Sequence, residues 1–134
     1  MKKKVLIICT GNSCRSIMAE GLIKKYLPEV EVFSAGAKPI GIVVDGTKKV
    51  LEEEGIWSEK EFYSKGLDEV EKFGPFDLAV TVCDSAKSCI TYLNAKKQIH
   101  IGLEDPFLKG FEEFLKTKDE ILNRVIPKIK KNLK

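Results

Sequence analysis

Apolar and polar positions follow two different patterns along this chain. Short continuous aliphatic runs, such as VLII at residues 5–8, are typical of strands that are buried on both faces of a parallel sheet. Apolar positions spaced by three and four residues are typical of amphipathic helices. The pattern predicts strands over residues 5–8, 30–36, 76–83 and 98–102, and helices over residues 16–27, 43–54, near 67–73, and from about 111 onward.

The second and the last helical patterns each predict one face that packs against a core. Pro127 lies inside the C-terminal pattern, where the missing N–H and the proline ring predict a kink or a restart of the helix. The predicted inward residues are Val43, Val44, Thr47, Val50 and Leu51 in the second helix, and Phe114, Leu115, Ile121, Leu122, Val125, Ile126 and Ile129 in the last one.

Alternating strands and helices form βαβ units, which build parallel sheets with right-handed crossovers. We therefore predict an α/β fold with an open four-stranded parallel sheet, flanked by helices and ordered as in flavodoxin. The length of 134 residues fits a single domain over residues 1–134. Ligands of such sheets bind beyond the carboxyl ends of the strands. Cys9, Cys83 and Asp105 should all lie at that edge.

Composition narrows the class of protein. The chain is 43% hydrophobic and 32% charged with a net charge of +3, which is typical of a soluble globular protein and argues against a nucleic-acid footprint. The N-terminal apolar run is only about five residues long, shorter than the ~7 to 15 of a signal peptide, so we expect a cytoplasmic protein that enters no membrane. In a reducing compartment, four cysteines indicate metal binding, catalysis or redox exchange.

The segment CTGNSCRS at residues 9–16 joins the first strand to the first helix. Small residues before a helix N-terminus aim several backbone N–H groups into one concavity, and this arrangement binds anions. The fork of Arg15 matches two oxygens of a tetrahedral oxyanion. The same positive field should favour the thiolate of Cys9, which would then be a nucleophile. The expected oxyanion ligands are Thr10, Gly11, Asn12, Ser13, Cys14, Arg15 and Ser16.

Less reactive roles are also open for some of these residues. Buried strand cysteines are often only small apolar side chains. Cys14 could pack inertly under the loop, or protect Cys9 by forming a disulfide with it under oxidation. His100, the only histidine, lies in an apolar strand and is expected to be a core or rim residue.

The segment VLIICTGNSCRSIMAEG strongly resembles the phosphate-binding loop of low-molecular-weight protein tyrosine phosphatases and of the arsenate reductases built on that fold. SAG at 34–36, FDLAVTVCD at 76–84 and EDP at 104–106 continue the resemblance through most of the chain. The resemblance implies that Cys9 is the nucleophile, that Arg15 binds the oxyanion and that Asp105 is the general acid.

The segment CDSAKSC at 83–89 favours the reductase over the phosphatase, because a phosphatase needs no further cysteines. The resemblance implies that arsenate is reduced to arsenite through a relay from Cys9 to Cys83 to Cys89, which thioredoxin then reduces. In the predicted strand order, Cys9 and Cys83 end adjacent strands about 4.8 Å apart, within reach of a disulfide. The alternative is a phosphatase that uses Cys9, Arg15 and Asp105, with Phe107 beside the acid.

The relay also makes a geometric prediction. If residues 84–94 are helical when reduced, Cys83 and Cys89 are about 9 Å apart along the axis. A disulfide needs Cα atoms closer than roughly 7 Å, so this segment should unwind on oxidation.

Some reductases of this type bind potassium through an Asn, a Glu, a Ser and an Asp. Asn12, Glu20 and Ser34 match that set, but Lys65 stands opposite the Asp, so its ammonium could replace the ion. We therefore expect no metal and no cofactor apart from the reducing equivalents, and a monomeric protein. A non-enzymatic oxyanion sensor, or a zinc module that uses all four cysteines, is a further alternative.

Overall fold

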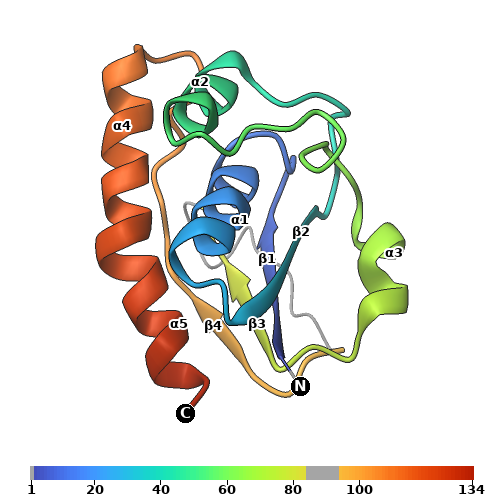
Figure 1. Cartoon of the computed structure of the whole chain (residues 1–134). Coiled ribbons are helices and arrows are strands. Elements are labelled where there is room, and N and C mark those ends of the chain that lie inside the picture. The colour runs from blue at the N-terminus through green and yellow to red at the C-terminus, as the bar shows by residue number, and fades with distance from the viewer. Residues whose placement is uncertain (1, 84–93) are drawn as a thin grey trace.

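The computed structural model describes residues 2–83 and 94–134, and in this part of the chain four parallel strands form one sheet (Figure 1). The strands are β1 (Lys3–Cys9), β2 (Val30–Gly36), β3 (Leu78–Thr81) and β4 (Gln98–His100). Their order is β2-β1-β3-β4, so β1 pairs with β2 on one side and with β3 on the other. The predicted open parallel sheet and its flavodoxin-like order are confirmed.

The helices lie where the apolar spacing predicts them, with bounds that differ by one or two residues. Val44 has an extended backbone, so the second helix begins just after it. The described helices are α1 (Arg15–Tyr26), α2 (Asp45–Glu53), α3 (Leu67–Val70), the 3-10 turn η1 (Glu71–Phe73), α4 (Phe111–Glu120), the π-helical turn η3 (Ile121–Val125) and α5 (Ile126–Asn132).

Pro127 accounts for the interrupted C-terminal helix. It stands in the first turn of α5, directly after the wider turn η3. Proline lacks an N–H donor and its ring collides with the carbonyl four residues earlier, so the regular α-helix cannot pass through it. The predicted kink or restart at this position is confirmed.

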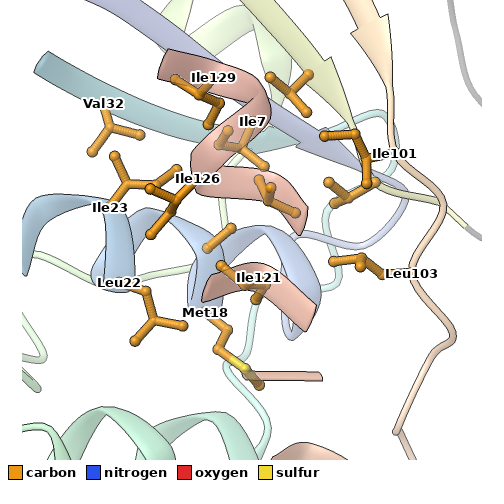
Figure 2. Packing of buried hydrophobic residues seen from close by; sticks show 14 of the residues in the cluster. Ile7, Met18, Leu22, Ile23, Val32, Ile101, Leu103, Ile121, Ile126 and Ile129 are labelled. Atoms are coloured by element: carbon orange, nitrogen blue, oxygen red, sulfur yellow. The ribbon is translucent and has the colours of Figure 1, made fainter. Parts of the chain in front are cut away.

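Alternating residues of β1 face two different layers of the core. Val5 and Ile7 belong to the larger apolar cluster, which α1, η3 and α5 cover, whereas Leu6 and Ile8 face Val70 of α3. Figure 2 shows Ile7 together with residues of α1, η3 and α5 that belong to the same cluster. The predicted inward residues are buried, except that Leu115 and Leu122 lie partly exposed at the margin of that cluster.

The sheet brings the polar loops to one edge. Cys9 pairs with Gly36 at the carboxyl ends of β1 and β2. A Cβ atom on Gly36 would lie 2.7 Å from the carbonyl oxygen of Thr10, so only glycine lets β2 approach the loop that follows β1.

Two predicted strands are shorter than the apolar runs that predicted them. β3 ends at Thr81, which leaves Cys83 two residues beyond the strand, and β4 ends at His100. His100 is exposed and its Nδ1 lies 2.8 Å from the hydroxyl of Thr81, so it is a rim histidine.

Within residues 2–83 and 94–134, no helix is long and apolar enough to span a membrane.

Candidate active site

Cys9 ends β1 and is almost completely buried, and the next five residues form the loop that leads into α1. Its Sγ lies 2.9 Å from the hydroxyl of Ser16, in the first turn of that helix. The side-chain amide of Asn12 donates to the same Ser16 oxygen at 2.7 Å. Because Ser16 accepts this bond, its own proton is available to Cys9, so the hydroxyl can donate to a thiolate. The loop is therefore arranged to stabilise a charged sulfur.

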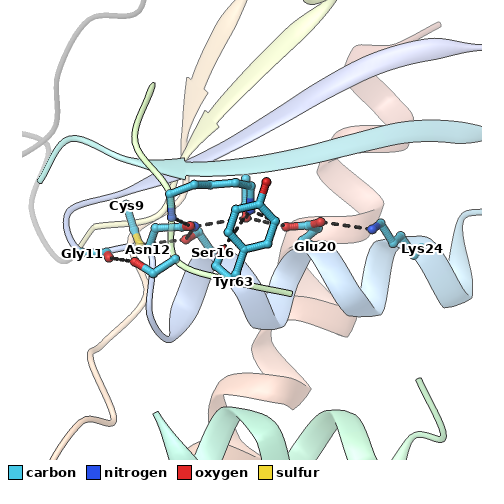
Figure 3. Close-up of polar contacts among 10 residues, drawn as sticks. Cys9, Gly11, Asn12, Ser16, Glu20, Lys24 and Tyr63 are labelled. Atoms are coloured by element: carbon cyan, nitrogen blue, oxygen red, sulfur yellow. Dashed lines mark hydrogen bonds and ion pairs between the residues drawn. The ribbon is translucent and has the colours of Figure 1, made fainter. Parts of the chain in front are cut away.

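Asn12 is held by a buried polar network behind the loop (Figure 3). It has a left-handed backbone with φ of 46°, which asparagine tolerates better than most residues. Its amide also donates to Ser34, and the hydroxyl of Ser34 in turn donates to the carboxylate of Glu20. The backbone N–H of Lys65 donates to the side-chain oxygen of Asn12 at 2.8 Å. Both ends of the Asn12 amide are thus fixed.

The Lys65 ammonium lies inside this network. It is 3.2 Å from the Ser34 hydroxyl, 3.2 Å from the carbonyl oxygen of Tyr63 and 3.5 Å from the Glu20 carboxylate. Lys65 and Glu20 are only 6% and 3% exposed, and Lys24 gives Glu20 a second cation at 3.1 Å. Buried charges need such partners, because the desolvation of an unpaired ion costs several kcal/mol. Lys65, the residue predicted to stand opposite the Asp ligand of potassium, therefore places a fixed cation in this network.

Residues 37–44, which we call the collar, hold the loop from the outside. In a planar trans peptide the C=O and the following N–H point in opposite directions, so a carbonyl held by the collar directs the next N–H away from it. Four loop carbonyls are held in this way, so the N–H groups that follow them point away from the collar. Three of the residues that carry these N–H groups, Thr10, Gly11 and Cys14, line the cavity described below and can form an anion cradle. The four bonds run from Ala37 to Cys9, from Lys38 to Thr10, from Ile40 to Gly11 and from Val44 to Ser13, at 2.8 to 3.2 Å.

Arg15 and Asp105 meet across the mouth of the cradle. Arg15 is 8% exposed, and its guanidinium donates to the carbonyl oxygen of Leu103 at 3.1 Å. Its other terminal nitrogen lies 3.6 Å from the Asp105 carboxylate. The second oxygen of that carboxylate accepts the N–H of Phe107 at 3.0 Å, which fixes the orientation of the carboxyl group. Arg15, which can bind an oxyanion, and Asp105, which can supply a proton, therefore lie side by side.

The cradle opens into a cavity of about 270 Å³, which is large enough for a tetrahedral oxyanion. A neighbouring hollow of about 380 Å³ is wider, but mostly acidic side chains of the 104–106 loop and α4 line it, and they repel anions. The smaller cavity is the better anion site. It is lined by Cys9, Thr10, Gly11, Ser13, Cys14, Arg15, Ile40, Asp105 and Phe107.

Known proteins match this chain along most of its length. The family model for low molecular weight phosphotyrosine protein phosphatase matches residues 4–134. The chain belongs to this family. The arsenate reductase of Brevibacillus brevis is 37% identical over 128 residues, which cover 92% of each chain. Both branches named in the sequence resemblance are thus represented among its relatives.

Relatives of known structure have the same fold as this chain. The arsenate reductase of Archaeoglobus fulgidus superposes with a TM-score of 0.79 at 30% identity, covering 90% of this chain and 94% of that one. The thioredoxin-dependent arsenate reductase of Corynebacterium glutamicum gives a TM-score of 0.67 at 26% identity, covering 91% of this chain and 59% of the other. The predicted family resemblance is confirmed.

Of the four cysteines of this family member, three lie among the described residues. Cys9 and Cys14 are free, and Cys83 is disulfide-bonded. The sulfur of Cys83 lies 4.0 Å from the hydroxyl of Thr10, the residue that follows the nucleophile. Cys89 and the predicted unwinding of residues 84–94 fall on positions 84–93, outside the described residues.

Cys14 also lines this cavity, but its thiol is not suited to act as a nucleophile. Burial raises the pKa of its thiol to about 12, and Thr47 offsets part of that effect. At neutral pH the thiol is therefore protonated and a poor nucleophile.

Among residues 2–83 and 94–134, no group of three or more His, Cys, Asp or Glu side chains could hold a metal ion.

Three contributors to the site were not predicted. The carbonyl of Leu103 receives Arg15, Ile40 lines the cavity, and the hydroxyl of Ser64 donates to the carbonyl of Gly11. Backbone carbonyls carry no residue signature, and the Ser64 contact joins loops that lie 53 residues apart. Only the folded arrangement of the loops could have pointed to these residues.

Proposed function

We propose that this chain is an arsenate reductase that converts arsenate to arsenite and is regenerated by thioredoxin. The observation that carries the proposal is the state and place of Cys83. It is disulfide-bonded, and its sulfur contacts the residue next to the nucleophile. A hydrolytic enzyme has no use for a disulfide at this place, whereas a reductase must pass two electrons to its substrate.

The first step uses the cradle. The Cys9 thiolate attacks arsenic, an As–S bond forms and an As–O bond breaks, and Asp105 supplies a proton so that the leaving oxygen departs as water. Arg15 and the backbone N–H groups bind the remaining oxygens and stabilise the charge that develops on them.

The second step moves the electrons. The Cys83 thiolate attacks the sulfur of Cys9, so an S–S bond forms and the As–S electron pair stays on arsenic, which leaves as arsenite. Cys89 then attacks Cys83 and releases Cys9 as a thiolate. The dithiol of thioredoxin supplies two electrons to reduce the final disulfide. The likeness to a thioredoxin-dependent arsenate reductase supports this choice of partner.

The deciding experiment follows arsenate-dependent oxidation of reduced thioredoxin by the wild type and by Cys89→Ser, with a chromogenic aryl phosphate assayed in parallel. We expect the variant to lose repeated arsenate turnover and to keep its hydrolysis of the aryl phosphate. The proposal fails if arsenate draws no electrons from thioredoxin and both proteins hydrolyse the aryl phosphate equally.

Equal hydrolysis of the aryl phosphate without electron transfer would favour a phosphatase. One observation supports that alternative. Phe107 is 46% exposed and lines the cavity directly beside Asp105, where it could contact the ring of an aromatic phosphate ester. In that reaction Cys9, Arg15 and Asp105 would keep their roles and the phosphoryl group would pass from Cys9 to water.

We also propose that the enzyme needs no potassium, because the residues around Asn12 do not suit a bound cation. The Lys65 ammonium already lies against Ser34 and Glu20, and a second cation there would be repelled. Activity should be equal in potassium and sodium salts at one ionic strength. A clear gain in potassium would contradict this proposal.

Finally, we propose that the protein works as a monomer in the cytoplasm, where thioredoxin is kept reduced. Light scattering coupled to gel filtration should give one mass near 15.0 kDa. A stable dimer mass would overturn the first part, and recovery of the protein outside the cytoplasm would overturn the second.

A further inference from the structure

Ser64 lies far from the loop in sequence, yet its side chain contacts the cradle directly. Its hydroxyl donates to the carbonyl oxygen of Gly11 at 3.0 Å and accepts the N–H of Gly41 at 3.1 Å. The residue is half-buried at the junction of the cradle, the collar and the loop that carries Lys65. One hydroxyl therefore joins three segments.

The directions of these bonds follow from the chemistry of the groups. A backbone N–H can only donate, so Gly41 occupies a lone pair of the Ser64 oxygen and the hydroxyl proton points to Gly11. The Gly11 carbonyl also accepts the N–H of Ile40 at 3.1 Å. Two donors thus occupy both lone pairs of this oxygen and hold it on the outer side of the loop.

The held carbonyl fixes the next peptide group. Because the Gly11–Asn12 peptide is planar, the N–H of Asn12 must point away from Ser64. The following residue, Lys65, holds the side chain of Asn12 through its own N–H at 2.8 Å. Ser64 and Lys65 are adjacent in one loop. Together they fix the main chain and the side chain of Asn12, which has a left-handed backbone.

We propose that Ser64 is a positioning residue that keeps the cradle in its anion-binding form before the substrate arrives. It does not line the cavity and does not touch the oxyanion. Preorganised donors bind a developing charge without reorganising, so loss of this hydroxyl should weaken oxyanion binding and slow the reaction. The inference rests on the proposed function only in requiring that the cradle binds an oxyanion.

The test compares Ser64→Ala, Ser64→Thr and Ser64→Val, with calorimetric titration of inorganic phosphate as the main readout. Threonine keeps the hydroxyl, and valine has the same shape without it. Ser58→Ala is the matched control, since Ser58 is also half-buried and its side chain makes no hydrogen bond in the described structure. We expect affinity for phosphate to fall about tenfold in the alanine and valine variants, as the loss of one hydrogen bond predicts. Threonine and the control should bind as the wild type does.

Three outcomes would overturn the role of Ser64. One is wild-type affinity in both the alanine and the valine variants. Another is an equal loss in the threonine and valine variants, because packing and not the hydroxyl would then matter. The third is a lower melting temperature with unchanged phosphate affinity and unchanged kcat, which would indicate a purely structural residue. If the alanine variant does not fold, the threonine and valine pair still decides. If the wild type itself does not bind phosphate, the proposed function fails instead.

Discussion

At the scale of single residues, the two free cysteines of the loop differ in what surrounds their sulfur atoms. Cys9 has the hydroxyl of Ser16 at 2.9 Å, and that hydroxyl is able to donate to it. Cys14 is buried, and its pKa is raised to about 12. Of the two thiols, Cys9 is therefore the one built to react.

The raised pKa of Cys14 predicts how stability depends on pH. The folded state favours the neutral thiol, so its contribution is fully present below about pH 9 and is lost as pH rises toward 12. Near pH 10, the loss relative to pH 8 should be about 1.4 kcal/mol. Urea unfolding at pH 8, 9 and 10 should show this extra loss in the wild type and not in Cys14→Ala. Parallel pH profiles for the two proteins would contradict the prediction.

Leu108 has an unfavourable backbone for its side chain. It has φ of 67° in a turn closed by the N–H of Lys109 and the carbonyl of Pro106, and its side chain is 88% exposed. The left-handed region costs a leucine roughly 1–2 kcal/mol, and glycine avoids this cost but loses more chain entropy on folding. Leu108→Gly should therefore raise the free energy of unfolding by about 0.5 to 1 kcal/mol. Phe107→Gly, one residue earlier, is the control and should lower it.

At the scale of elements, α2 and α4 touch through a position that has no side chain. A Cβ atom on Gly46 would lie 2.5 Å from the ring of Phe114. Glycine lowers helix propensity, but here it lets the aromatic ring pack against the backbone. The packing of two helices therefore outweighs the local preference of one.

Gly46→Ala should accordingly destabilise the protein although alanine favours helices. The gain in propensity is about 1 kcal/mol, whereas overpacking against a buried ring costs about 1 to 3 kcal/mol. We expect a net loss of about 1 kcal/mol in chemical denaturation, recovered when Phe114 is also replaced by leucine. Gly110→Ala is the control, since a Cβ there meets open space. A stabilised Gly46→Ala would show that the ring shifts freely.

The elements themselves were largely predictable from sequence, and their ends were not. The spacing of apolar residues predicts the helices and buried strands, and Pro127 predicts the interruption of the last helix. The ends depend on pairing instead. The apolar run from Phe76 continues to Cys83, but the strand covers only Leu78–Thr81, which pair with β1, and β4 pairs only with Ala79–Thr81.

At the scale of the whole molecule, the sheet order decides which residues meet. The closeness of Cys9 and Asp105 could be predicted because parallel strands place their carboxyl ends at one edge, and Arg15 could be predicted from the loop sequence that follows Cys9. The contacts of Ser64 and Leu103 could not, because they depend on how loops from distant parts of the chain fold over that edge.

Oxyanion binding should stabilise the entire fold, because the cradle is assembled only in the native state. Phosphate at 100 times its dissociation constant should add about 2.7 kcal/mol to the free energy of unfolding. Thermal unfolding with and without phosphate at fixed ionic strength measures this gain. Arg15→Ala should lose most of it, and an equal gain in the variant would place the anion elsewhere.

The collar also has a consequence for how this sequence can vary. Ala37, Lys38 and Ile40 each give a main-chain N–H to the loop, and Pro39, which has none, stands at the one position between them that gives no such bond. Since the backbone and not the side chains makes these bonds, a saturation library over residues 37, 38 and 40 should accept a wide range of amino acids at 37 and 38, whereas the side chain of Ile40 also lines the cavity. Proline should be excluded at each of the three positions, whereas position 39 already carries it.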